Sequence, residues 1–128
     1  MLVLIARPSD DPESFPRSIV VGFDGSEDAL EALAVARRLD EETNASLRAV
    51  AAVGGHKLPL DPVREHAPEV ALDHRPPVEA LVAEGEGADL VVLGSRVLHG
   101  LAAVGSVSER VAHQAKSSVL VVRSRPLP

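Results

Sequence analysis

The chain has 128 residues, 45% of them hydrophobic, which suffices for the core of one domain and is too short for two. It has no cysteine, which excludes disulfides, thiolate metal sites and cysteine nucleophiles. A formal net charge of −6 argues against a surface for nucleic acid or for an anionic membrane. No apolar run approaches the roughly 20 residues of a membrane span, and no basic residue precedes the first apolar run as in an export signal. We therefore expect a cytoplasmic protein.

Strand and helix patterns alternate from residue 18 onward. Apolar, β-branched runs predict the strands, and apolar positions at helical spacing predict the helices. The predicted elements are a strand at 18–23, a helix at about 26–43, a strand at 46–53, a helical turn near 61–67, a strand at 69–73, a helix from Pro76 to about Glu84, a strand at 88–94, a helix at 106–116 and a strand at 119–123. This order implies a parallel sheet wound by right-handed crossovers.

Residues 1–17 do not continue the alternation. LVLIARPSDDP looks like a faint copy of the C-terminal VLVVRSRPLP, with an apolar strand, an arginine and a proline-bearing tail. We therefore divide the chain into an N-terminal extension at 1–17, with a strand at about 2–6, and a domain at 18–128. The extra strand either joins an edge of its own sheet or pairs with a second chain, because an uncovered edge favours association.

Three stretches resemble the universal stress proteins (the UspA-like family): IVVGFDGSEDALEAL, ADLVVLGSR and GSVSERVAHQAKSSVLVVR. The resemblance covers roughly residues 18–125 and includes the order of the motifs. It implies a three-layer α/β fold of the adenine nucleotide alpha-hydrolase-like type, doubly wound around a five-stranded parallel sheet of order 3-2-1-4-5. It also implies a stress-response role, usually a dimer through the last strand and, in one subgroup, ATP between the ends of strands one and four. The extension resembles the junction between the repeats of tandem members.

In that strand order, the first and fourth strands are neighbours whose connections diverge, and open α/β sheets bind ligands at such a switch point. Asp24 follows the first strand, and Gly94 ends the fourth. Both strands lead to helix N-termini, which attract anions. The first helix begins with two acidic residues, which repel phosphate, so we expect a triphosphate at the second, beside Gly105 and Ser106.

The resemblance implies a role for each residue around this point. Asp24 would accept hydrogen bonds from the ribose hydroxyls, and the backbone near Ala52 and Val53 would meet the adenine ring. The loop glycines would let backbone amides approach the phosphates, Ser106 would donate its hydroxyl to the γ-phosphate, and Arg96 would add positive charge. The cofactor would be ATP or AMP, with Mg only alongside ATP. The predicted cofactor-binding residues are Asp24, Ser26, Ala52, Val53, Gly94, Arg96, Gly100, Gly105, Ser106 and Val107.

The loop after the fourth strand departs from the pattern G-x2-G-x9-G-S/T that is typical of the nucleotide-binding members. Val97 stands at the second glycine, and only seven residues separate it from Gly105. The spacing from Gly100 to Ser106 resembles a Walker A loop without its lysine, so we expect no enzyme beyond a slow ATPase. The shorter loop favours a second hypothesis, a dimeric interaction module of the same fold that binds no nucleotide.

Several of these residues also have a purely structural interpretation. Ser106 and Glu109 fit a capping box, in which the helix itself uses the serine hydroxyl. Asp24 could hold the turn to Ser26 through its side chain. Gly94 could have the sole role of letting the chain turn tightly as it leaves the strand. The histidines show no metal-ligand spacing, and there is no G-x-S-x-G elbow, so we assign neither a metal nor a catalytic residue.

The last strand, SSVLVVR at 117–123, is apolar on both faces and lies at a sheet edge in the expected order. Such a strand needs a cover. Either a second copy of the chain or the strand at 2–6 supplies it, so we expect a homodimer through one of these two strands. If the N-terminal strand covers the edge of its own chain, the usual dimer would be blocked.

Overall fold

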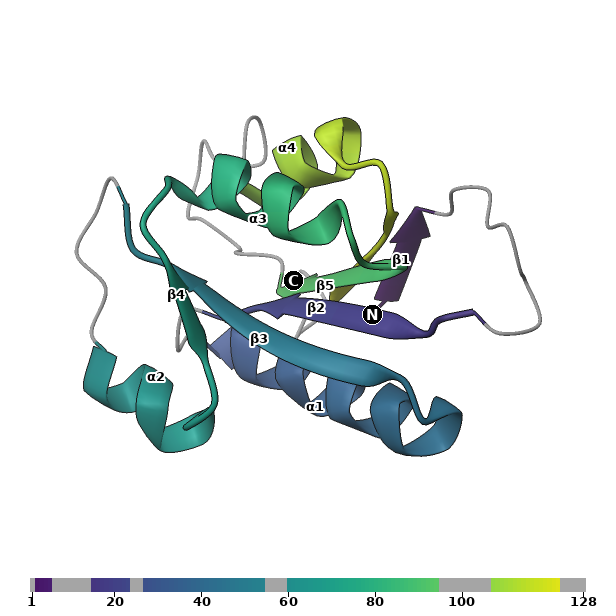
Figure 1. The fold of residues 1–128 in the computed structure, drawn as a ribbon, viewed down its shortest axis with the longest axis horizontal. Coiled ribbons are helices and arrows are strands. Elements are labelled where there is room, and N and C mark those ends of the chain that lie inside the picture. Colours follow the sequence, from purple (N-terminus) through teal and green to yellow (C-terminus); the bar gives the residue numbers. More distant parts are fainter. Residues whose placement is uncertain (1, 6–14, 24–26, 55–59, 95–106, 123–128) are drawn as a thin grey trace, which may run out of the picture.

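The computed structural model describes residues 2–5, 15–23, 27–54, 60–94 and 107–122. Within these ranges, strands and helices alternate after one N-terminal strand, as the sequence predicts (Figure 1). The elements are β1 (Leu2–Ile5), β2 (Ser18–Gly22), α1 (Glu27–Thr43), β3 (Ser46–Ala52), α2 (Leu60–His66), β4 (Ala71–Asp73), α3 (Pro77–Gly85), β5 (Leu90–Gly94), α4 (Val107–Gln114) and β6 (Ser118–Val122).

The strands form one sheet in the order β1-β6-β5-β2-β3-β4. The five strands from β2 to β6 all pair in parallel, and their spatial order β4-β3-β2-β5-β6 is the predicted 3-2-1-4-5. The fold class is therefore confirmed. The sixth strand, β1, pairs antiparallel with β6 of the same chain, so it adds to the edge of its own sheet. The predicted homodimer is not tested by this single chain and stays a prediction.

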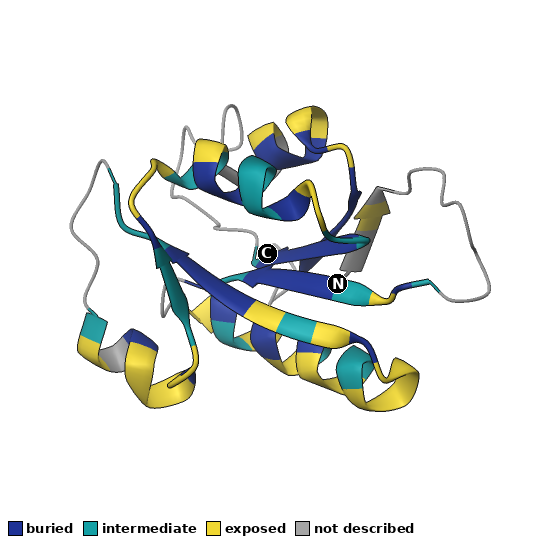
Figure 2. Cartoon of the chain, viewed as in Figure 1, coloured by how far each residue is buried: buried dark blue, intermediate teal, exposed yellow. Residues whose placement is uncertain are grey.

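Helices cover both faces of the sheet, which explains why its central strands are apolar throughout. All five residues of β6 are buried, as are the first four of β5. In Figure 2 these strands are dark blue between helices whose outer faces are exposed. The fold thus has three layers, with α1 on one face of the sheet and α3 and α4 on the other.

Two separate cores result, because successive residues of a strand point to opposite faces. On β5, Val92 joins the core beneath α1, and Val91 joins the core beneath α3 and α4. Leu33 of α1 and Val63 of α2 belong to the first core, and Val111 of α4 to the second. Neither core includes a described β1 side chain, because Leu4 is exposed.

The helix ends follow ordinary stop and start signals. Asn44, directly after α1, has φ of 56°, and its N–H donates to the Asp40 carbonyl at 2.8 Å. Asparagine tolerates this left-handed conformation better than most residues, so it ends the helix at little cost. Pro77 is the first residue of α3, where its missing N–H costs no hydrogen bond, as the sequence predicts. No helix in the described ranges is long and apolar enough to cross a membrane.

Candidate functional site

The chain reverses its winding between β2 and β5. These strands pair directly, with Val21 beside Val92, but β2 continues through α1 to β3 on one side, and β5 continues through α4 to β6 on the other. This is the predicted switch point. The described residues of the predicted set are Ala52, Val53, Gly94 and Val107, whereas Asp24, Ser26, Arg96, Gly100, Gly105 and Ser106 lie outside the described residues.

Gly94 brings the end of β5 against the first turn of α1. A Cβ atom at Gly94 would lie 2.5 Å from the carbonyl carbon of Asp28 and 2.7 Å from the amide nitrogen of Ala29. Real Cβ atoms essentially never approach other atoms so closely, and here the neighbours are backbone atoms. Gly94 is therefore needed for the packing of β5 on α1, which supports its structural interpretation. The same contact places the acidic first turn of α1, with Glu27 and Asp28, at the switch point.

Ala52 and Val53 lie at the carboxyl end of β3, next to β4. Ala52 is opposite Asp73 in the parallel register. The N–H of Val53 donates to the Asp73 carbonyl at 2.8 Å, and the N–H of Gly54 donates to the Arg75 carbonyl at 3.2 Å. These two amides hold the residues after β3 to the end of β4 and to the segment that follows it, so they are not available to an adenine ring. Any contact between adenine and this segment would involve other groups.

Val107 is the first residue of α4. The glycine and serine before it, on which the predicted phosphate contacts depend, are outside the described residues, and so is the serine of the predicted capping box. The choice between a phosphate role and a capping role for Ser106 therefore stays open. Within the described part of the chain, no three acidic or histidine side chains gather as a metal site requires.

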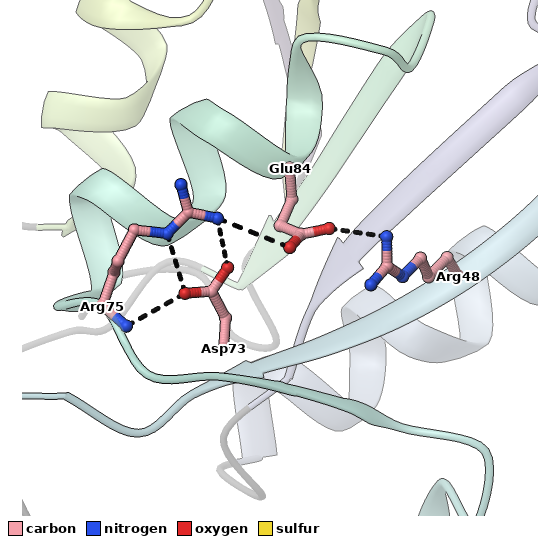
Figure 3. Close-up of polar contacts among 4 residues, drawn as sticks. All are labelled: Arg48, Asp73, Arg75 and Glu84. Carbon is pink, nitrogen blue, oxygen red and sulfur yellow. Dashed lines mark hydrogen bonds and ion pairs between the residues drawn. The ribbon is translucent and has the colours of Figure 1, made fainter.

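Four charged residues that sequence reasoning did not single out form a cluster between α3 and the sheet (Figure 3). Arg75, just after β4, donates from Nε to Asp73 Oδ1 at 2.9 Å and from Nη2 to Asp73 Oδ2 at 2.5 Å. Its Nη2 also lies 3.6 Å from Oε2 of Glu84 on α3. The other carboxylate oxygen of Glu84 lies 2.7 Å from Nη1 of Arg48 on β3. The cluster thus ties α3 to two strands of the sheet.

The two carboxylates of this cluster respond to their surroundings in opposite ways. The Arg75 guanidinium, hydrogen-bonded to the carboxylate, holds the pKa of Asp73 well below its usual range, although burial opposes this. Burial raises the pKa of Glu84, and the neighbouring Asp73 raises it further, against the lowering effect of Arg48. The hydrogen bond to Asp73 raises the pKa of Arg75. Each charged side chain has a partner of opposite charge within the cluster, so a structural role explains why these four residues lie together. The D-x-R spacing of Asp73 and Arg75, at the end of a predicted strand, is the sequence signal for this cluster.

Comparison with known proteins gives one family. Residues 62–123 match the model of the Universal stress protein family. No curated protein matches the sequence. The crystal structure of a universal stress protein in complex with cAMP is 26% identical, with a TM-score of 0.73, and the match covers 86% of this chain and 99% of that one.

Two further neighbours are about twice as long as this chain. A universal stress protein from Archaeoglobus fulgidus is 24% identical, with a TM-score of 0.76, and the match covers 95% of this chain and 49% of that one. A functionally unknown protein from Pseudomonas aeruginosa is 16% identical, with a TM-score of 0.74 and coverages of 95% and 52%. Both share the fold. In its fold, in the segment at residues 62–123 and in its similarity to the cAMP-bound protein, the chain thus resembles the universal stress protein family.

Proposed function

We propose that this chain is a cytoplasmic stress-response protein that binds an adenine nucleotide at the carboxyl ends of β2 and β5. The observation that carries the proposal is the switch point itself, because open α/β sheets bind ligands where the winding reverses. A neighbour of 26% identity, which this chain covers almost completely, is in complex with cAMP, a second reason to expect an adenine nucleotide.

The electrostatics of the switch point favour one orientation of the ligand. The first turn of α1, with Glu27 and Asp28, carries two acidic residues that disfavour phosphate there. The start of α4 has none before Glu109, so the phosphates would lie at Gly105 and Ser106. The base would then lie toward β3, near Ala52. Because the amides of residues 53 and 54 are already hydrogen-bonded, base recognition would use carbonyl oxygens and apolar contacts there.

Calorimetric titration of the full chain with ATP, AMP, cAMP and GTP tests the proposal. We expect heat from at least one adenine nucleotide and less from GTP, because the site would recognise the base. Gly105→Val should abolish this heat, since its side chain would obstruct the approach of phosphate to the backbone. Gly87→Ala is the matched control, because a Cβ there meets nothing within 4 Å. An absence of both heat and thermal shift at millimolar nucleotide would refute the proposal.

A second candidate function is an interaction module of the same fold that binds no nucleotide. The replacement of a motif glycine by Val97 and the shortened loop before Gly105 favour it. The same titration separates the two functions, since this module gives no heat with any of the four nucleotides.

A further inference from the structure

β6 has a strand on each side and no free edge. β5 pairs with it in parallel, and β1 pairs with it antiparallel. The antiparallel register runs from Leu2 opposite Val122 to Ile5 opposite Val119, so every residue of β1 takes part. The surface of β6 on which another strand can dock is therefore occupied by a segment of the same chain.

Both strands of this pair have the composition of a strand that associates readily. β6 reads SVLVV and β1 reads LVLI, with neither charge nor proline in either. Natural proteins discourage unwanted pairing at a sheet edge by placing charged residues or proline there, or by covering the edge. Without β1, the exposed edge of β6 could pair antiparallel with β6 of a second copy around a two-fold axis.

The direction of β1 suits a connection within one chain. Because β1 runs antiparallel to β6, its last residue, Ile5, lies opposite Val119 near the start of β6. Ser18, the first residue of β2, lies at the same end of the sheet, since Ile19 is beside Leu90 and Leu90 is beside Ser118. The 12 residues between Ile5 and Ser18 can span about 40 Å, whereas three strand spacings amount to about 14 Å. The connection therefore reaches easily.

The two double-length neighbours match more of this chain than the cAMP-bound neighbour does. Their matches cover 95% of this chain, which leaves out only about six residues and must therefore extend into the extension at 1–17. The cAMP-bound neighbour, which this chain covers almost completely, matches only 86% of it.

We propose that the outer edge of β6 is a strand-binding surface whose occupant is β1 of the same chain, and that β1 keeps a second copy of this chain from docking there. Removal of β1 from this edge converts the single chain into a dimer through β6. The proposal is independent of nucleotide binding.

An engineered disulfide tests which chain supplies β1. Leu4 and Leu120 are directly opposite in the register, and the Cα atoms of such a pair are about 4.5–5.5 Å apart, within the range of a disulfide. The protein has no cysteine of its own, so Leu4→Cys/Leu120→Cys offers a single pairing. We expect oxidation to give a cross-link within one chain, seen by mass spectrometry under non-reducing conditions.

The matched control is Leu4→Cys/Ala71→Cys, because Ala71 lies on β4 at the opposite edge of the sheet. The two cysteines of this control variant should remain reduced, because they are too far apart to form a disulfide. If Leu4→Cys/Leu120→Cys links two chains, or also stays reduced, the occupant of the edge is not β1 of the same chain and the proposal fails.

Light scattering tests the blocking role. Adjacent residues of an antiparallel strand point their N–H groups alternately toward and away from the neighbouring strand, so Val3→Pro/Leu4→Pro removes at least one donor to β6. We expect the full chain to have the mass of one chain, 13.4 kDa, and the proline variant to have twice that mass. Because β1 is the last strand at one edge of the sheet and its Leu4 is exposed, the variant should keep the folded circular-dichroism spectrum.

The control Val3→Thr/Leu4→Thr keeps both amides and the preference for a strand, so it should retain the mass of one chain. A full chain that is already dimeric, or a proline variant that stays at the mass of one chain, would show that β1 does not block this edge.

Discussion

Gly94 and Asp28 come together at the switch point, where the end of β5 meets the backbone of the first turn of α1. The distance from an added Cβ to the Asp28 carbonyl carbon would be only 2.5 Å. The contact joins the two elements that leave the switch point in different directions. It follows that Gly94 sets how closely α1 lies on β5, whatever ligand the site accepts.

We expect Gly94→Ala to lower the free energy of unfolding by about 2 kcal/mol, since the backbone of α1 must shift to admit the methyl group. Chemical denaturation measures this loss. Gly87→Ala is the control. Its added Cβ meets nothing within 4 Å, so it should be neutral or stabilise the protein by up to about 1 kcal/mol through the unfolded state. Equal effects of the two substitutions would contradict the close contact at Gly94.

Most of the fold could be predicted because the parallel strands are buried on both faces. Continuous apolar runs such as SIVVG at 18–22 and LVVLG at 90–94 are typical of such strands, and both appear as β2 and β5. Strand bounds were less predictable. The predicted strand at 69–73 is only Ala71–Asp73, because Val70 donates its N–H to the Ala67 carbonyl in a turn instead of to β3.

The site was less predictable than the fold, because its contacts join residues far apart in the chain. A glycine at the end of a strand fits a phosphate-binding loop as well as a close backbone contact, and only the position of α1 shows the contact at Gly94. The sequence alone leaves the amide of Val53 available to adenine, because its partner across the sheet, the Asp73 carbonyl, is 20 residues away in the chain. Arg48 and Glu84 are 36 residues apart, and no local pattern indicates their ion pair.

Asp73→Asn should lower stability at neutral pH and weaken its dependence on acid. The pKa of Asp73 lies below its unfolded value, so its contribution is present above the unfolded pKa and is lost as pH falls toward the folded one. Replacing a buried, charged hydrogen-bond partner of Arg75 costs about 2 kcal/mol. Urea unfolding between pH 7 and pH 2.5 measures both effects. An unchanged acid slope would show that the Arg75 contact does not hold Asp73 ionised.

Glu84→Gln should change the pH dependence in the opposite direction. The pKa of Glu84 is raised, so its contribution is present below the unfolded pKa and is lost as pH rises through the folded one. Glutamine removes this opposing contribution, so stability should rise more steeply with pH just above the unfolded pKa than in the unmodified protein. The same urea series measures it. A flatter rise would mean that Arg48 outweighs burial and lowers the pKa of Glu84.

Ser117→Ala should leave stability unchanged or raise it by up to about 1 kcal/mol. The Ser117 hydroxyl is buried and has no hydrogen-bond partner among the described residues, and a buried polar group without a partner is costly. Ser18→Ala is the contrasting variant, because the Ser18 hydroxyl accepts a hydrogen bond from the Asp89 N–H at 3.0 Å where β2 begins. The same N–H also donates to the Ser18 carbonyl at 3.0 Å and keeps that partner, so loss of the hydroxyl should cost about 0.5 kcal/mol. Thermal and urea unfolding of both variants would show effects of opposite sign, and a marked loss at Ser117 instead would reveal a partner for its hydroxyl.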